Sequence, residues 1–343
     1  MFRLKEIKGN ISCISSTNKF FCFNTKQEEL FLDEIKIDTI TSVCGYFFSN
    51  NYFTYSNKVD YTNSIIDLKS KSTYSLGKVS LQFQKSNNKF IALEKVEEKR
   101  NLIIFDLLSN EKKLIQKNIS FGIKLLSKNN LIINEGWTTL KSLSLLTGEY
   151  EWEVDLGGRK YNLAGDELEA KIRTIIDVIE NSLFVWLDNK CLVEICIATG
   201  QIKSETFPLQ ELEEKGIITA VMLPQYHEPD QSIYFFYQDY LVQVHLPTQN
   251  TTLLWQDVNY NIGPFQISDN TIYFIGSYEK GAFFRNHIGV FDRKKNEVVW
   301  MQKVIELNKE SYNNLKEIQA SDTKIYVLDT EGTLYIFEKE ETA

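Results

Sequence analysis

A short apolar strand that begins at a polar residue, usually Asn, recurs along the whole chain. It is rich in aromatic and β-branched residues and occurs eight times in the 343 residues. The eight segments are 18–23, 51–55, 88–93, 130–133, 181–186, 231–237, 270–275 and 323–328. Their starts lie about 33 to 53 residues apart, which is the spacing expected of β-propeller blades.

Each of these strands is followed by a second apolar strand, a turn and a third strand. The clearest case is 140–146, then Thr147-Gly148-Glu149, then 150–156. Thr199-Gly200-Gln201 and Thr248-Gln249-Asn250 hold the same place in later repeats. Gly and Asn supply the positive φ that tight hairpins need, so the pattern predicts an all-β chain of hairpin-linked strands.

Eight blades of about 43 residues each account for the chain length, and seven blades are the alternative because the first repeat is short. In that repeat, 28–32 has to serve as the third strand. The last repeat supplies strands at 315–320, 324–328 and 333–337 and lacks a fourth. We expect the alternating segment 2–7 to complete this C-terminal blade and close the ring, because closure removes exposed sheet edges. The prediction is one β-propeller domain over residues 1–343.

The segment LLTGEYEW, with Thr147, Gly148 and Trp152, resembles the Thr-Gly then Trp signature of propellers of the pyrroloquinoline-quinone-like (tryptophan-docking) repeat class. Trp255 and Trp300 follow weaker versions of the same turn. The resemblance implies that these three tryptophans pack between neighbouring blades. Quinone enzymes of this class are typically exported and place charged and metal-binding residues around the cofactor. This chain shows no such set, so we expect the fold without the quinone site.

Residues suited to catalysis are scarce. The chain has three His, and His227, His245 and His287 lie in different repeats without a recurring Cys, Asp or Glu at ligand spacing. There is no Gly-rich phosphate loop and no nucleophile-elbow pattern. We therefore predict no catalytic residue, no cofactor and no metal site, and we expect a protein that is not an enzyme.

The net charge of the chain limits the classes of binding partner, and its use of cysteine indicates the cellular compartment. Lys plus Arg number 38 against 46 for Asp plus Glu, a net charge of -8, which argues against nucleic acid and anionic membranes. No apolar run approaches the length of a membrane span, and the first residues lack the apolar core of a signal peptide. The five Cys are odd in number and lie within or beside apolar runs, so we expect reduced, buried thiols in a cytoplasmic protein. A monomer is the working expectation, although the residues do not identify the oligomeric state.

Aromatic and Arg residues gather in the longer loops that this strand register predicts on one face. The candidate protein-contact residues are Tyr61, Trp137, Arg159, Tyr161, Tyr278, Phe283, Phe284 and Arg285. Such residue types anchor protein interfaces. Packing of Phe283 and Phe284 over the blade beneath is an equally good interpretation. Segments 166–171 and 208–215 have helical propensity and acidic starts, which predicts two short surface helices.

These features favour a non-catalytic cytoplasmic propeller that binds a protein partner through loops on one face. A narrower version is an immunity protein that neutralises a toxin, which the acidic charge suits. The alternative is a propeller that binds a small molecule or carbohydrate in its central channel, because aromatic side chains also suit sugar stacking.

Overall fold

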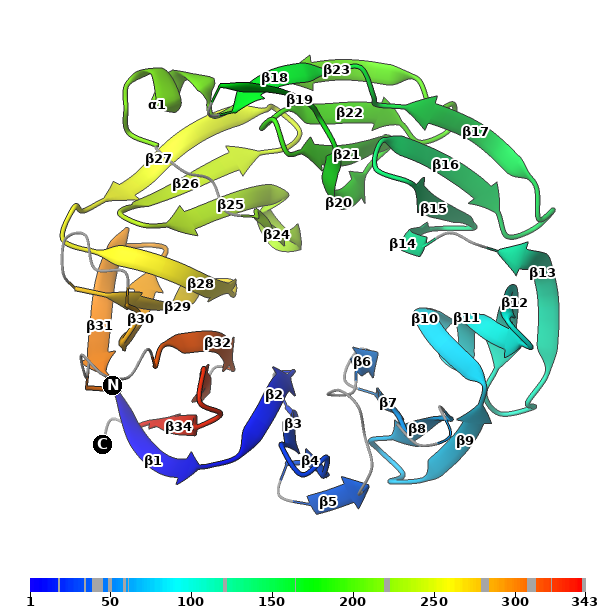
Figure 1. Cartoon of the computed structure of the whole chain (residues 1–343), viewed down its shortest axis with the longest axis horizontal. Helices are drawn as coiled ribbons and strands as arrows, with labels where there is room; N and C mark the ends of the chain where they lie inside the picture. The colour runs from blue at the N-terminus through cyan, green and yellow to red at the C-terminus, as the bar shows by residue number, and fades with distance from the viewer. Residues whose placement is uncertain are drawn as a thin grey trace. The chain divides into compact units, whose positions relative to one another are not determined.

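The computed structural model describes residues 1–17, 19–33, 35–38, 46–48, 51–57, 60, 62–119, 122–163, 165–218, 223–278, 284–306, 313–321 and 323–340. Apart from one five-residue α-helix and one short 3₁₀ helix, the regular elements in these ranges are β-strands. Eight four-stranded sheets form the blades of an eight-bladed β-propeller, with one extra two-stranded sheet (Figure 1). The predicted fold class is confirmed, with eight blades rather than seven.

The blades follow one another along the chain, and each runs from its first strand to its fourth. The first three are β2 (Ile11–Ser16), β3 (Phe21–Thr25), β4 (Leu30–Leu32) and β5 (Ile35–Asp38); β6 (Tyr46–Phe48), β7 (Tyr52–Ser56), β8 (Asn63–Asp67) and β9 (Thr73–Gly77); and β10 (Val79–Ser86), β11 (Lys89–Val96), β12 (Lys99–Asp106) and β13 (Lys112–Ile119). The next two are β14 (Gly122–Ser127), β15 (Asn130–Glu135), β16 (Thr139–Ser144) and β17 (Tyr150–Asp155); and β20 (Ile172–Ile179), β21 (Ser182–Leu187), β22 (Leu192–Cys196) and β23 (Ile202–Thr206).

The remaining three blades complete the chain. They are β24 (Gln225–His227), β25 (Ser232–Tyr237), β26 (Tyr240–His245) and β27 (Asn250–Gln256); β28 (Asn261–Ile267), β29 (Thr271–Ser277), β30 (His287–Asp292) and β31 (Glu297–Lys303); and β32 (Leu315–Ala320), β33 (Lys324–Asp329), β34 (Leu334–Lys339) and β1 (Phe2–Lys8). The α-helix is α1 (Gln210–Glu214), and the extra sheet is β18 (Lys160–Leu163) with β19 (Asp166–Glu169).

Each of the eight polar-led segments becomes the second strand of its blade. These second strands are buried on both faces: every residue of β21 is buried, as are five of six in β25. The fourth strands alternate between exposed and half-covered residues, as β23 does. A strand packed on both faces reads as a continuous apolar run, which explains why the second strand carries the strongest sequence signal.

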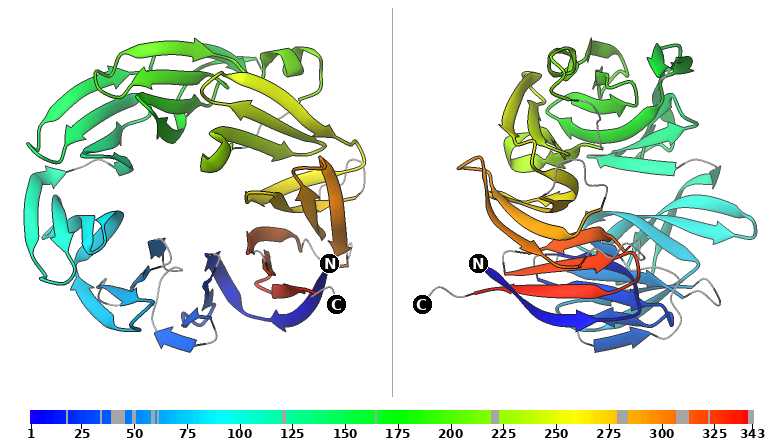
Figure 2. Two further views of the ribbon diagram at one scale, coloured as in Figure 1. Left: turned by 180° about the vertical axis from the view of Figure 1, so that it is seen from behind. Right: turned by 60° about the vertical axis from the view of Figure 1, so that its left-hand side comes forward.

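The N-terminal strand completes the last blade, as predicted. β1 pairs antiparallel with β34 from Phe2 opposite Lys339 to Lys8 opposite Leu334. Phe2 is buried in a core cluster that includes Tyr273 and Phe337. Figures 1 and 2 show β1 and β34 side by side. The first and last segments of the chain therefore share one sheet, and its outer edge is the first strand.

Two compact units can be distinguished by the density of contacts along the chain. One comprises residues 1–78, 235–242 and 253–343, and the other comprises residues 79–234 and 243–252. The first unit holds the core cluster around Phe2 and a second cluster around Phe23. The second unit holds clusters around Trp152 and Leu131. A single domain over the whole chain stays a prediction.

The three repeat tryptophans pack where two sheets meet. The Trp152 Nε1 donates to the carbonyl of Ile197 at 2.7 Å, and its ring lies against Gly200. A Cβ at Gly200, whose φ is +73°, would come within 2.9 Å of that ring, so the Thr-Gly turn is itself part of the packing. Trp255 and Trp300 contact aromatic side chains of neighbouring strands.

One of the two predicted surface helices forms and the other does not. Segment 208–215 contains α1, as predicted. Segment 166–171 instead begins with β19, which pairs with β18 across a turn where Gly165 has a φ of +98°. In this segment the backbone groups are hydrogen-bonded across the hairpin to β18 and are therefore not free to form the bonds of a helix.

The cysteine prediction holds in part. Cys22, Cys191 and Cys196 carry thiols, and the first two are buried. Cys13 is disulfide-bonded, so the prediction of reduced thiols is wrong there, and Cys44 lies outside the described residues. A disulfide needs two Cβ atoms about 3.8 Å apart, and folding rather than sequence spacing sets that distance. No helix in the described ranges is long and apolar enough to cross a bilayer.

Candidate protein-contact site

The predicted contact residues divide between the two compact units. Trp137, Arg159 and Tyr161 lie in the second unit, and Tyr278, Phe284 and Arg285 lie in the first. Tyr61 and Phe283 are outside the described residues. Each group is therefore considered on its own.

Trp137 lies in the turn between β15 and β16, and its side chain is 70 % exposed. The backbone around it is fixed, because its carbonyl accepts from the Ile172 N–H at 2.8 Å and the Thr138 carbonyl accepts from the Leu156 N–H at 2.9 Å. The Lys171 ammonium lies 5.3 Å from the indole centroid. A large aromatic side chain is thus held in solvent on a well-anchored turn.

The β18–β19 hairpin lies in the connection between β17 and the next blade. Tyr161 packs against the Trp152 core cluster, and burial together with the carboxylate of Asp188 raises the pKa of its hydroxyl. Register places Tyr161 opposite Leu168 and Leu163 opposite Asp166, so these four side chains share one face of the hairpin. Leu163 is 57 % exposed. The hairpin is anchored at its base and presents an apolar tip.

Arg159 fixes the start of this hairpin. Its guanidinium binds both carboxylate oxygens of Glu205, with Nε donating to Oε2 at 3.0 Å. This hydrogen bonding lowers the pKa of Glu205 and raises that of Arg159. The Gly158 N–H donates to Glu169 at 2.5 Å and ties the two ends of the hairpin together. Arg159 therefore positions the hairpin through an intramolecular ion pair.

The group in the first unit is more embedded in its blade. Tyr278 is 54 % exposed, but its ring lies 4.9 Å from that of Tyr260. The Arg285 guanidinium covers Gly263 so closely that a Cβ there would lie 2.2 Å from Nε. The Arg285 N–H also donates to Asn314 Oδ1 at 2.7 Å. Phe284 and Arg285 are only half exposed, which favours packing over the blade beneath.

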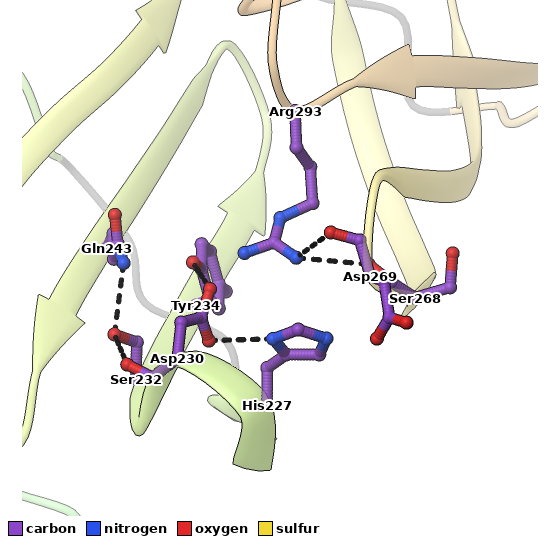
Figure 3. A network of polar contacts seen from close by, with 8 residues as sticks. All are labelled: His227, Asp230, Ser232, Tyr234, Gln243, Ser268, Asp269 and Arg293. Carbon is purple, nitrogen blue, oxygen red and sulfur yellow. Dashed lines mark hydrogen bonds and ion pairs between the residues drawn. The ribbon is translucent and has the colours of Figure 1, made fainter.

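A polar network that the sequence interpretation missed surrounds Asp230. Its carboxylate is 2.6 Å from His227 Nδ1 and accepts from the Tyr234 hydroxyl at 2.6 Å (Figure 3). The Ser232 hydroxyl donates to the Asp230 carbonyl at 2.8 Å and accepts from Gln243 at 3.0 Å. The only local signal was His227 three residues before Asp230. The network holds the turn between β24 and β25, and Ser232 donates to the backbone rather than to the imidazole.

The basic run 293–295 forms a turn. Arg293 Nη1 donates to the carbonyls of Ser268 and Asp269 at 3.1 and 2.6 Å (Figure 3). The N–H groups of Lys294 and Lys295 both donate to the carboxylate of Asp292. The run therefore closes the hairpin between β30 and β31.

The described residues offer little evidence for a metal site or for a reactive thiol. No group of three His, Cys, Asp or Glu is placed there to hold a metal ion. Burial raises the pKa of Cys191 to about 11, which keeps this thiol protonated near neutral pH. Hydrogen bonds from Thr199 and its neighbour lower the pKa of Cys196. Among the described residues, however, this thiol is not part of a group that could bind a metal ion.

Comparison with known proteins identifies the fold. No model of a known protein family matches the sequence, and no curated protein sequence matches it. The C-terminal WD40 domain of Sif2 is similar in structure, with a TM-score of 0.63 and 10% identity over 99% of both chains. BamB from Moraxella catarrhalis has a TM-score of 0.56 and 10% identity over 99% of this chain and 100% of its own. The computationally designed Ika8 protein has a TM-score of 0.57 and 12% identity over 96% of both chains. These likenesses establish the β-propeller fold.

Proposed function

We propose that this chain is a non-catalytic protein-binding propeller whose contact surface is built on Trp137 and the β18–β19 hairpin. The observation that carries the proposal is the 70 % exposed indole of Trp137 on a turn with fixed backbone. Exposed Trp side chains on rigid supports are typical interface anchors, because they bury much area on binding and lose little conformational entropy.

The charge around this surface indicates the chemistry of the partner. All four residues of β19 are exposed, and Asp166, Glu167 and Glu169 are acidic. Glu167 is partly neutralised by Lys160 at 2.7 Å, whereas the chain as a whole carries a net charge of -8. We infer a protein partner with an apolar pocket for Leu163 or Trp137 and a border of Lys or Arg, because opposite potentials steer association.

The non-catalytic part of the proposal rests on what the polar groups already bind. The His227 imidazole is buried beside Asp230, and the nearby Ser232 hydroxyl donates to a backbone carbonyl. A nucleophile needs a general base within hydrogen-bond reach of its own proton. Toxin neutralisation, a ligand in the central channel and a cytoplasmic location stay predictions.

The test compares Trp137→Ala with Tyr278→Ala as the matched control, since both aromatic side chains are more than half exposed. A partner recovered by crosslinking to the wild-type chain is titrated against both variants. We expect Trp137→Ala to weaken binding by roughly tenfold or more and Tyr278→Ala to leave it unchanged. Glu167→Lys should slow association and reduce its salt dependence. Equal affinity for Trp137→Ala and the wild type would exclude this surface.

A further inference from the structure

Six fourth strands with a described register, β5, β9, β17, β23, β31 and β1, share one irregularity, in which a single residue is bypassed. In β23 the residue that follows the bypassed one is Ser204. In β17, β31 and β1 the residue that follows the bypassed one pairs with the middle of the third strand. In these three strands the bypassed residues are Glu151, Val299 and Lys5. The residues that pair next are Trp152 with Ser142, Trp300 with Val290 and Glu6 with Ile336. Glu6 therefore occupies the position that two docking tryptophans occupy in other blades.

The match extends across the whole sheet. In the β28–β31 blade the row is Gln266, Tyr273, Val290 and Trp300, and in the closing blade it is Gln319, Tyr326, Ile336 and Glu6. Both rows thus run Gln, Tyr and a β-branched residue before they diverge at the fourth strand. Along this row the closing blade therefore differs from its counterpart at the docking position of the fourth strand.

A pocket of about 490 Å³ lies at this position, between the closing blade and the β2–β5 blade. We call it the seam pocket. Its volume falls within the range of small-molecule sites, roughly 300 to 1,000 Å³. The Glu6 side chain does not fill it, because it is 46 % exposed and its carboxylate binds Lys8 at 3.2 Å. At the β31 junction the Trp300 ring instead packs against Phe2 and Phe337.

Aromatic rings line the seam pocket. The Phe21 and Tyr326 rings are stacked at 3.7 Å with an interplanar angle of 5°, and the Phe23 ring lies 5.7 Å from that of Phe21. Phe21 and Phe23 are buried members of one core cluster, so their rings are held in place. Fixed, flat rings suit a planar aromatic ligand, which gains from stacking or edge contacts.

The charged lining indicates the sign of the ligand. Four lysines and three carboxylates line the pocket, a positive excess in a chain whose net charge is -8. Lys5 and Lys324 both bind Glu338, at 2.5 and 3.0 Å. Lys19 has no ion pair within the described ranges, and there the Tyr326 hydroxyl has no hydrogen-bond partner. One cation and one hydroxyl donor thus remain for a ligand, beside the Asp33 carboxylate, which accepts from the Phe21 N–H at 2.9 Å.

We propose that the seam pocket binds a small aromatic anion, with its ring in the place of a docking indole and its anionic group near Lys19 and the Tyr326 hydroxyl. An aromatic carboxylate matches both requirements, because a carboxylate accepts from an ammonium and a phenol at the same time. The pocket residues belong to the first compact unit and the β18–β19 hairpin to the second, so this site is tested separately from protein binding.

The experiment titrates the full chain with indole-3-acetate and with the neutral indole-3-acetamide by calorimetry. We expect saturable one-site binding of the carboxylate and at least several-fold weaker binding of the amide, since charge-assisted hydrogen bonds are about twice as strong as neutral ones. Lys19→Ala should reduce the affinity for the carboxylate to that for the amide and leave the amide unaffected. Failure of the carboxylate to bind the wild type overturns the proposal, and so does unchanged carboxylate affinity in Lys19→Ala.

A second variant fills the pocket. Glu6→Trp places an indole at the docking position, so we expect it to abolish binding of both probes and to raise the melting temperature. Arg3→Trp, on the same strand but outside the pocket lining, is the matched control and should bind both probes as the wild type does. Undiminished binding by folded Glu6→Trp overturns the proposal. The Lys19→Ala titration decides the matter independently if Glu6→Trp does not fold.

Discussion

Two junctions in the first compact unit share a strand register and differ in how they are held together. At the β31 junction Trp300 fills the space beside Phe2 and Phe337. At the seam the same position holds Glu6, which binds Lys8 and leaves a pocket. The strand that closes the ring is held by backbone pairing with β34 and by Phe2, which packs against Trp300, whereas its own docking position carries no indole.

The two blades also differ at the end of the third strand, which is β30 in one and β34 in the other. After β30 the chain turns directly into β31, and the Asp292 carboxylate accepts two backbone N–H groups of that turn. After β34 no turn leads to β1, because the two strands come from opposite ends of the chain. Glu338 holds the equivalent position and binds Lys5 and Lys324 instead. In the closing blade, side-chain ion pairs thus occupy the place where a hairpin turn connects the third and fourth strands of the other blade.

Removal of residues 1–8 should have the largest effect. It deletes β1, takes Phe2 out of the core and leaves β34 as an unpaired edge. We expect the melting temperature to fall by more than about 10 °C, or the cooperative transition to disappear. The control is the double substitution Arg3→Ala with Lys5→Ala, which keeps the strand and removes its two ion pairs. An unchanged melting curve for the deletion would contradict closure by this strand.

Substitution at the docking position should discriminate between the two junctions. Trp300→Ala removes a large ring from the contacts with Phe2 and Phe337, so we expect a loss of about 3–5 kcal/mol in the free energy of unfolding. Glu6→Ala at the matched position should change it by no more than about 0.5 kcal/mol, because Glu6 is a surface residue with a weak ion pair. Urea denaturation measures both. Equal losses would show that the two positions are equivalent.

The smallest effect concerns pH. Hydrogen bonds from Lys5 and Lys324 lower the pKa of Glu338 below its ordinary value. A carboxyl with a lowered pKa stabilises the fold above its unfolded pKa, and this stabilisation disappears as the pH falls through the folded value. Glu338→Gln should therefore destabilise the protein by at most about 1 kcal/mol at pH 7, because the pairs are exposed. Urea midpoints of variant and wild type should converge under strongly acidic conditions, and a gap that persists there would argue against this ion-pair origin.

Much of the fold was readable from the sequence because second strands are buried on both faces. A continuous apolar run with a polar leader marks each blade, and eight such runs predict eight blades. The missing fourth strand of the last repeat predicted the role of residues 2–7 for the same reason, since an unpaired edge has to be covered. The Thr-Gly turns followed from local residue types, and the burial of Trp152 from the resemblance to tryptophan-docking propellers.

The candidate sites depended on contacts between residues far apart in the chain. Arg159 looked like a free loop cation, yet Glu205 binds it from the far end of the next blade. Segment 166–171 has helical propensity, but pairing with β18 makes it begin as a strand. The residue types in the loops suggested both Trp137 and Arg285 as contact residues. The structure shows that Trp137 is exposed, whereas Arg285 packs over Gly263.

The sequence alone thus indicated the all-β class, the closing strand, and eight blades with seven as the alternative, because these depend on local apolar periodicity and on strand count. Only the tertiary structure revealed that Glu6 stands in the register of a docking tryptophan and that a pocket with Lys19 and Tyr326 lies there. The physical reason is that a register position is defined by the strand opposite, and for β1 that strand lies at the other end of the chain.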